Sequence, residues 1–155
     1  MTHFKKIDHL GIAVPNLQEA IESYQDLLGA AMTHQEEVED QKVMTAFFEV
    51  GESHVELLGA TDESSPIAKF LQKRPRGGLH HICVEVEDIE ATLEMYRQKG
   101  VRLIDEKPRL GAHNKKIAFV HPASTHGVLL ELSQSMPHSN SDSSVSSESN
   151  HTSED

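Results

Sequence analysis

Hydrophobic and polar residues alternate along two segments that resemble each other. Residues 7–14 read Ile-Asp-His-Leu-Gly-Ile-Ala-Val, and residues 79–86 read Leu-His-His-Ile-Cys-Val-Glu-Val. Alternation of this kind is typical of β-strands, whose side chains point in turn to opposite faces of a sheet. A residue that commonly caps helices follows each segment, Asn16 after the first and Asp88 after the second. The pattern therefore predicts two strand–helix units.

The residues after the two caps repeat the same apolar positions at helical spacing. The matching pairs are Leu17 and Ile89, Ile21 and Leu93, and Tyr24 and Tyr96. Spacings of four and three residues place such side chains on one face of a helix. Gly29 and Gly100 follow at the points where a left-handed residue commonly ends a helix.

Three further strand-like runs follow each predicted helix. They cover about 30–38, 42–50 and 54–59 in the first half, and about 101–106, 115–121 and 127–132 in the second. A short helix near 65–74, with Ser64 or Ser65 as its cap and Pro66 in its first turn, joins the halves. We therefore expect an α+β domain over residues 1–135, built from two repeated βαβββ modules at about 5–60 and 77–134.

The last 20 residues, 136–155, have a different composition. They contain eight serines, four acidic residues and no Lys or Arg, and their only large apolar side chains are Met136 and Val145. Such a segment buries too little apolar surface to offset the entropy of ordering it. We expect a disordered, acidic, Ser-rich tail.

Charge and cysteine content narrow the classes of partner. The net charge of −11 falls only to −7 when the tail is set aside, with 21 acidic residues against 14 basic ones. An acidic domain is unsuited to broad contact with nucleic acid or an anionic membrane surface. No apolar run approaches the ~18 residues that would suggest a membrane span. The single cysteine, Cys83, excludes an internal disulfide, and a cytoplasmic location is expected.

Two histidines occupy equivalent positions in the two modules. His9 aligns with His81, and in the first strand Gly11 and Ala13 share the face of His9. A sheet face that carries a histidine followed by small residues is typical of a cavity wall. One such histidine alone would more simply be a hydrogen-bonded core residue, but its recurrence favours a shared function. His80, which aligns with Asp8, is expected to flank the site.

Two glutamates repeat in the same way. Glu56 and Glu131 both lie between hydrophobic residues in the last strand-like run of a module. Burying such a carboxylate costs free energy unless it is paired or bound to metal, although an exposed sheet face would also accommodate it. Two imidazoles with one or two carboxylates suit a divalent cation such as Zn, Mn, Fe, Co or Ni. The remaining histidines, among them His54, His113, His121 and His126, are weaker candidates.

Three long segments carry a resemblance to a known family. They are IDHLGIAVPNLQEAI, VELLGATDESSPIAKFLQKRPRGGLHHICVEV and LGAHNKKIAFVHPASTHGVLLELSQ. Paired βαβββ modules with these residues resemble the vicinal oxygen chelate (glyoxalase-like) superfamily, and within it the methylmalonyl-CoA epimerases. The resemblance implies one divalent metal ion, Co, Mn, Zn or Ni, at His9, His81 and Glu131, with Glu56 in the fourth position. It also implies a homodimer and an acyl-CoA substrate.

The same resemblance implies a reaction. Epimerisation removes the proton between the thioester and the carboxylate and returns it to the opposite face, while the metal stabilises the enolate. Glu56 and Glu131 are the expected acid/base pair. Some relatives carry an acidic residue in the third strand as a candidate base, and the corresponding position here is Thr45, with Glu49 further along. Candidate contacts for the CoA phosphates are Lys73, Arg74, Arg76, Lys107, Arg109, Lys115 and Lys116.

Three alternative functions remain open from sequence. A lactoylglutathione lyase would use a similar ligand set. A dioxygenase would use His9, His81 and Glu131 to hold iron(II). A non-enzymatic module would bind a small molecule between the halves without a metal.

Overall fold

The computed structural model describes residues 3–137 and confirms the expected α+β fold of two modules. The first module comprises β1 (Phe4–Ala13), α1 (Leu17–Leu28), β2 (His34–Val38), the short helix η1 (Glu39–Gln41), β3 (Val43–Val50) and β4 (Ser53–Ala60). The connecting helix α2 spans Pro66–Lys73. The second module comprises β5 (Gly78–Val86), α3 (Ile89–Gln98), β6 (Arg109–Leu110), η2 (Ala112–Asn114), β7 (Lys115–Val120), η3 (Pro122–Ser124) and β8 (Leu129–Ser135).

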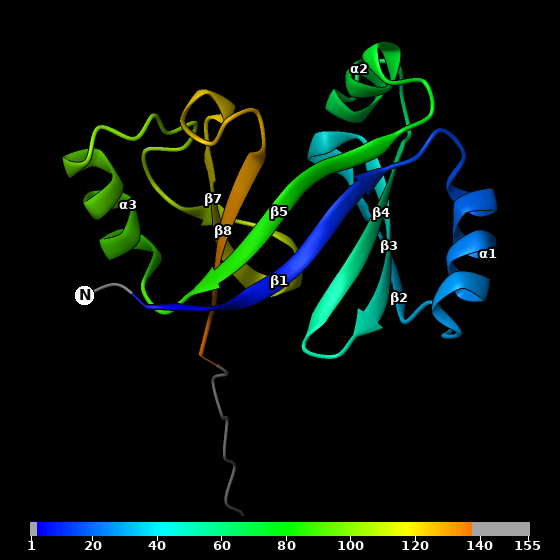
Figure 1. Ribbon diagram of the computed structural model, residues 1–155, viewed down its shortest axis with the longest axis horizontal. Coiled ribbons are helices and arrows are strands. Elements are labelled where there is room, and N and C mark those ends of the chain that lie inside the picture. Colours follow the sequence, from blue (N-terminus) through cyan, green and yellow to red (C-terminus); the bar gives the residue numbers. More distant parts are fainter. Residues whose placement is uncertain (1–2, 138–155) are drawn as a thin grey trace, which may run out of the picture.

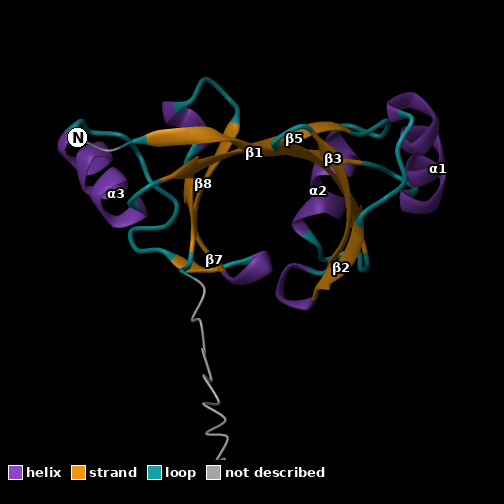
Figure 2. Cartoon of the chain, turned by 90° about the horizontal axis from the view of Figure 1, so that it is seen from below, coloured by secondary structure: helices purple, strands orange, loops and turns teal. Residues whose placement is uncertain are grey.

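All eight strands form one sheet in the order β2-β3-β4-β1-β5-β8-β7-β6. The first strands of the modules, β1 and β5, pair antiparallel at its centre, and each pairs in parallel with the last strand of its own module. The two halves of the sheet therefore mirror each other in order. The sheet curls so that the regions of β2 and β7 approach each other, and α1 and α3 lie at opposite ends of the molecule (Figures 1 and 2).

The helices begin where the capping residues predict. The side chains of Asn16 and Asp88 accept hydrogen bonds from backbone N–H groups in the first turns of α1 and α3. Of the two candidate caps for α2, Ser65 makes the bond, to the N–H of Ile67. Each cap contributes about 1 kcal/mol to helix stability.

Apolar cores lie between the outer helices and the convex side of the sheet. Ile21 packs with Phe48 and Leu57 in the first module, and Leu93 packs with Leu132 in the second. Because each helix covers one face of its module's strands, the other face is left for polar side chains. None of the described helices is long and apolar enough to cross a membrane.

The prediction of a strand at 101–106 is wrong. Within it Leu103 makes only an isolated bridge to Val120, and the two-residue β6 forms the edge of the sheet instead. The Asp105 carboxylate accepts a hydrogen bond from the Phe119 N–H, so a side chain replaces part of the backbone ladder. The first-module run expected at 30–38 becomes a strand only from His34.

The expected tail, 136–155, lies outside the described residues except for Met136 and Pro137. Strand β8 ends at Ser135, beside the predicted end of the domain. The boundaries of the domain and the disorder of the tail stay predictions.

Candidate metal centre

The concave side of the curled sheet encloses a cavity of about 740 Å³ lined by residues of both modules. The four residues singled out by the repeat, His9, Glu56, His81 and Glu131, all line it. Each comes from one of the four central strands, β1, β4, β5 and β8, which are neighbours in the sheet. The symmetry of the strand order therefore brings two imidazoles and two carboxylates together.

The carboxylates of Glu56 and Glu131 both lie beside the Nε2 atoms of the two histidines. The Nε2 atom of His9 lies 2.9 Å from Nε2 of His81, 2.9 Å from Oε2 of Glu56 and 3.2 Å from Oε2 of Glu131. The Nε2 atom of His81 lies 3.3 Å from Oε2 of Glu131 and 3.9 Å from Oε2 of Glu56. These residues could hold one ion between them.

These distances fit a divalent cation. Metal–ligand bonds of about 2.1 Å place adjacent ligand atoms about 3 Å apart and opposite ones about 4 Å apart. Four of the five distances match adjacent ligands, and the fifth, between His81 and Glu56, approaches that of opposite ones. All four residues are buried or nearly so, and two carboxylates gathered away from water are costly without a positive partner.

A glycine makes room for one of the imidazoles. Gly11 lies opposite His81 in the pairing of β1 with β5, and a Cβ atom at Gly11 would lie 2.1 Å from Cε1 of His81. At the symmetric position Cys83 lies opposite His9. Neither Gly11 nor Ala13 lines the cavity itself: Gly11 leaves the space that the His81 ring occupies, and Ala13 packs with Val43 and Leu58.

Asp8 holds His9 from behind, a contact that sequence reasoning missed. Its Oδ2 atom lies 2.7 Å from Nδ1 of His9, and its Oδ1 atom accepts a hydrogen bond of 2.7 Å from Nζ of Lys115. Burial raises the pKa of Asp8, but His9 and Lys115 outweigh it and hold the pKa well below its usual range. An ionised carboxylate behind a ligating imidazole fixes its orientation and raises its basicity.

The alternation of β1 predicts that Asp8 points away from His9. The pairing with β5 shifts register between Ile7 and His9, and both Asp8 and His9 line the cavity. Such an irregularity interrupts the strict alternation of faces. One signal in the sequence could have identified Asp8: it is an acidic residue next to a candidate ligand, and the second module has His80 at the equivalent position.

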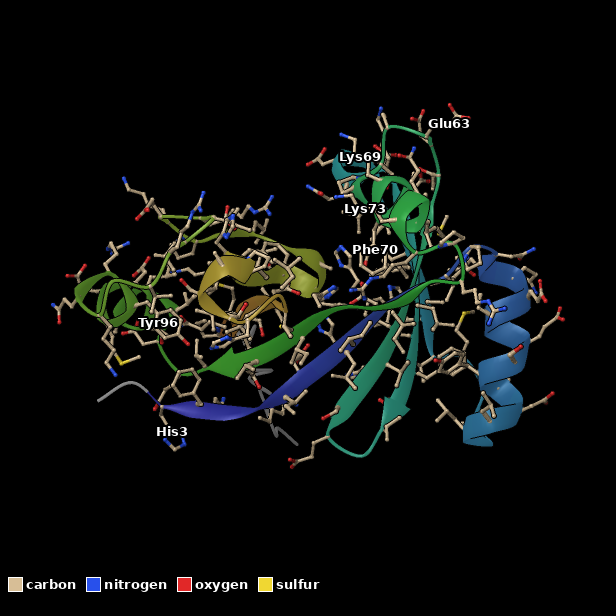
Figure 3. All side chains as sticks on the ribbon, turned by 45° about the horizontal axis from the view of Figure 1, so that its top comes forward. His3, Glu63, Lys69, Phe70, Lys73 and Tyr96 are labelled. Carbon is tan, nitrogen blue, oxygen red and sulfur yellow. The ribbon has the colours of Figure 1, made fainter. Side chains whose placement is uncertain are left out.

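His80 flanks His81, as expected. Unlike Asp8, which places a carboxylate beside His9, it places a second imidazole beside its neighbour. Its Nδ1 atom lies 3.0 Å from Nδ1 of His81, and its ring packs edge-on against Phe70 of α2 at 5.2 Å between centroids. Figure 3 shows Phe70 between α2 and the strands below it. Burial, with a smaller contribution from His81, lowers the pKa of His80 to about 4, so this imidazole is neutral at pH 7.

Burial also changes the pKa values of Glu131 and His9, which lie 3.2 Å apart in the cluster. It raises the pKa of Glu131, but the neighbouring His81 and His9 outweigh it and lower that pKa to about 2. Burial lowers the pKa of His9, but contacts with Asp8, Cys83 and the two glutamates outweigh it and raise that pKa above its usual value. In the metal-free protein the charges of this cluster are therefore partly balanced by a proton on His9.

The other candidates lie at various distances from this cluster. Thr45 is buried in the cavity wall, and its hydroxyl donates to the carbonyl of Glu36, whereas Glu49 is exposed and outside the lining. His54 and His113 line the cavity, and His121 instead caps η3.

Of the basic candidates, three already pair with acidic side chains: Lys115 with Asp8, Lys116 with Glu90, and Arg109 with Asp105. Arg74 lies over the ring of Phe70.

Comparisons with known proteins give a consistent result. Residues 8–119 match the model of the glyoxalase/bleomycin resistance protein/dioxygenase superfamily. The chain is 41% identical over 129 residues to the mitochondrial methylmalonyl-CoA epimerase of Dictyostelium discoideum, across 83% of this chain and 78% of that protein. It is 41% identical over 130 residues to the ethylmalonyl-CoA/methylmalonyl-CoA epimerase of Cereibacter sphaeroides, across 83% of this chain and 97% of that protein.

Solved structures agree with these relatives. The methylmalonyl-CoA epimerase of Mycobacterium tuberculosis superimposes with a TM-score of 0.79 at 41% identity, covering 84% of this chain and 88% of that one. A methylmalonyl-CoA epimerase in complex with methylmalonyl-CoA and NH4+ superimposes with a TM-score of 0.80 at 37% identity, covering 86% of this chain and 96% of that one.

Proposed function

The chain belongs to the methylmalonyl-CoA epimerases of the glyoxalase/bleomycin resistance protein/dioxygenase superfamily, and we propose that it interconverts the 2R and 2S forms of methylmalonyl-CoA. The observation that carries the proposal is the cluster of two imidazoles and two carboxylates in the cavity of a chain 41% identical to such epimerases. The named relatives favour this reaction over the lyase, dioxygenase and binding-module alternatives.

The proposed ligands of the metal are His9, Glu56, His81 and Glu131, and the proposed ion is Co, Mn, Zn or Ni. Their convergence and burial support this set. When bound, a divalent cation supplies positive charge that stabilises the negative charge developing on the thioester oxygen of the substrate.

The proposed acid/base pair is Glu56 and Glu131. Breaking the bond between the α-carbon and its proton leaves the electron pair delocalised into the thioester as an enolate. For this role the carboxylate would have to loosen from the metal, because an oxygen that ligates a cation is not free to take a proton. One carboxylate would then accept the proton, and the other, protonated beforehand, would deliver a proton to the opposite face. The two groups come from parallel partners of β1 and β5 on either side of the centre, an arrangement suited to opposite faces.

The proposed contacts of the CoA phosphates are basic side chains outside the cavity lining. Since Lys115, Lys116 and Arg109 pair with acids, the remaining candidates are Lys73, Arg74, Arg76 and Lys107. Figure 3 shows Lys73 on α2, whose first turn lines the same cavity through Pro66 and Ile67.

A homodimer and a cytoplasmic location are also proposed. The exposed apolar side chains of Phe4 and Ile7 on β1 and of Leu79 on β5 support the dimer, because exposed apolar side chains along the two central strands could pack against a second copy. The acidic domain and its single, buried cysteine are compatible with a reducing compartment.

The test is exchange of the α-proton of methylmalonyl-CoA with deuterium from solvent, measured with and without a chelator. We expect exchange that chelation abolishes and that added metal restores. Glu56→Gln and Glu131→Gln should each slow exchange at least 100-fold, whereas Glu49→Gln, a matched change outside the cavity, should leave it intact. Full exchange in Glu131→Gln with metal still bound would refute the acid/base role.

The range of substrates can be tested in the same assay. Since one relative is named an ethylmalonyl-CoA/methylmalonyl-CoA epimerase, ethylmalonyl-CoA is the natural second substrate to try. Turnover of a glutathione hemithioacetal, or oxygen uptake with a catechol and iron, in the absence of α-proton exchange would instead support the lyase or dioxygenase.

A further inference from the structure

A second cluster of metal-ligating side chains lies on the wall of the same cavity, away from the central strands. It consists of His34 and Glu36 on β2 and His113 on η2. We propose that these three residues form a second, weaker divalent-metal site that links the two modules. The site shares no residue with the central cluster, so its metal binding can be measured without reference to the proposed epimerase activity.

The three side chains already approach one another. Nε2 of His34 lies 3.3 Å from Oε2 of Glu36, and Nε2 of His113 lies 3.9 Å from the same oxygen. One ligand atom from each lies within 4.8 Å of the others. Bonds of about 2.1 Å require ligand atoms no more than about 4.2 Å apart, so small side-chain rotations complete the site. The side chains are 36–49% exposed and have room to make them.

Local structure explains why the three groups meet. His34 and Glu36 are two residues apart on a strand and therefore point to the same face. Their partners on β3, Phe47 and Thr45, also line the cavity. His113 arrives from the other module, and its ring lies 5.1 Å from that of Phe47 and 5.2 Å from that of His34.

The backbone at His113 is unusual for its residue type. His113 and the following Asn114 have φ values of 56° and 55°, in the left-handed region that residues other than glycine seldom adopt. Packing of the His113 ring against Phe47 supports this conformation. In this turn the imidazole lies 3.9 Å from the carboxylate of Glu36.

The chemistry of the cluster favours a borderline cation such as Zn²⁺. Two imidazoles and one carboxylate are the donors that zinc prefers when other positions remain for water. Glu37, Glu39 and Asp40 follow Glu36 in the sequence, line the same cavity and add negative potential that attracts a cation. Because these ligands are half exposed, unlike the central set, the site is expected to bind more weakly.

A metal at this position would join the two edges of the curled sheet. Strand β2 is the last strand on the side of the first module, and η2 precedes β7 on the side of the second. Figure 2 shows these regions approaching each other across the open side of the sheet. The bound ion would therefore stabilise the closed arrangement of the modules.

The experiment is calorimetric titration of the full-length, metal-free chain with Zn²⁺. We expect two equivalents in the native protein, a tight one and a weaker one. His113→Ala and His34→Ala should each weaken the second equivalent at least tenfold and leave the tight one in place. His54→Ala, a cavity-lining histidine outside the cluster, should keep both. Melting temperatures should rise with the second equivalent in the native chain and not in His113→Ala.

The C-terminal segment supplies the control for adventitious binding, because it contains His138 and His151. A variant with both changed to alanine should retain the weaker equivalent. The proposal is overturned if that variant loses it, if His113→Ala retains both equivalents, or if the native chain binds only one. None of these readouts depends on epimerase activity, so failure here leaves the proposed function untouched.

Discussion

The two modules present the same ligands to the centre of the cavity but surround them differently. His9 and His81 occupy equivalent strand positions, as do Glu56 and Glu131. Behind His9 stands the carboxylate of Asp8, itself paired with Lys115. Behind His81 stands the neutral imidazole of His80. The repeat thus sets the geometry of the centre, while the residue before each histidine sets its charge environment.

The residues opposite the histidines differ as well. Gly11 leaves space for the His81 ring, and Cys83 contacts His9. We infer that the His81 side tolerates no added volume, whereas the His9 side is held by hydrogen bonds. The two halves of the site should therefore respond differently to matched substitutions.

The largest difference is expected between Gly11→Ala and Cys83→Ala. A Cβ atom at Gly11 would overlap the His81 ring and must displace it, whereas alanine at Cys83 only removes a sulfur atom. We expect Gly11→Ala to weaken metal binding roughly 100-fold or more and Cys83→Ala to change it much less. Calorimetric titration of metal into both variants tests this. Equal affinities would mean that the space left by Gly11 is not needed for His81 to take part in metal binding.

The next difference is expected between the residues behind the ligands. Asp8→Asn removes the negative charge from His9 and should lower metal affinity about 10–100-fold. His80→Asn removes a neutral neighbour of His81 and should have a smaller effect. Metal affinities of the two variants can be measured with a competing chelator. A larger loss of affinity in His80→Asn than in Asp8→Asn would contradict this prediction.

A third difference concerns protons. Because contacts with acidic groups raise the pKa of His9, its imidazole is protonated at neutral pH in the metal-free protein, and the metal must displace that proton. Apparent affinity should therefore rise with pH, by about tenfold per unit if one proton is released. Calorimetry in buffers of different ionisation enthalpy counts the protons. Asp8→Asn should reduce the number released.

The smallest difference is expected between two adjacent lysines. Lys115 is partly buried against Asp8, whereas Lys116 pairs with Glu90 on the surface. We expect Lys115→Met to weaken metal binding roughly threefold to tenfold, because Asp8 loses its second partner, and Lys116→Met to have no measurable effect. Metal titration and deuterium exchange of the two variants test this. An equal loss of metal affinity in Lys116→Met would mean that net charge, and not the contact between Lys115 and Asp8, sets the effect.

Much of the site could be predicted from the sequence because it lies on repeated strands. Period-two alternation and the repeat predict that His9 aligns with His81 and Glu56 with Glu131, and the structure brings all four together. The ligand assignment itself stays a prediction. Asp8 was missed because a register shift in β1 interrupts the alternation on which the expectation rested.

The sequence by itself determined the helix caps, the two-module repeat and the four residues that meet in the cavity, because these depend on local spacing and on its recurrence. Only the tertiary structure decided that Asp8 supports His9, that Gly11 makes room for His81, and that His113 reaches His34 and Glu36. It also replaced the expected strand at 101–106 with the short β6. Each of these depends on contacts between segments distant in sequence, and no local pattern encodes how a sheet shifts register and curls.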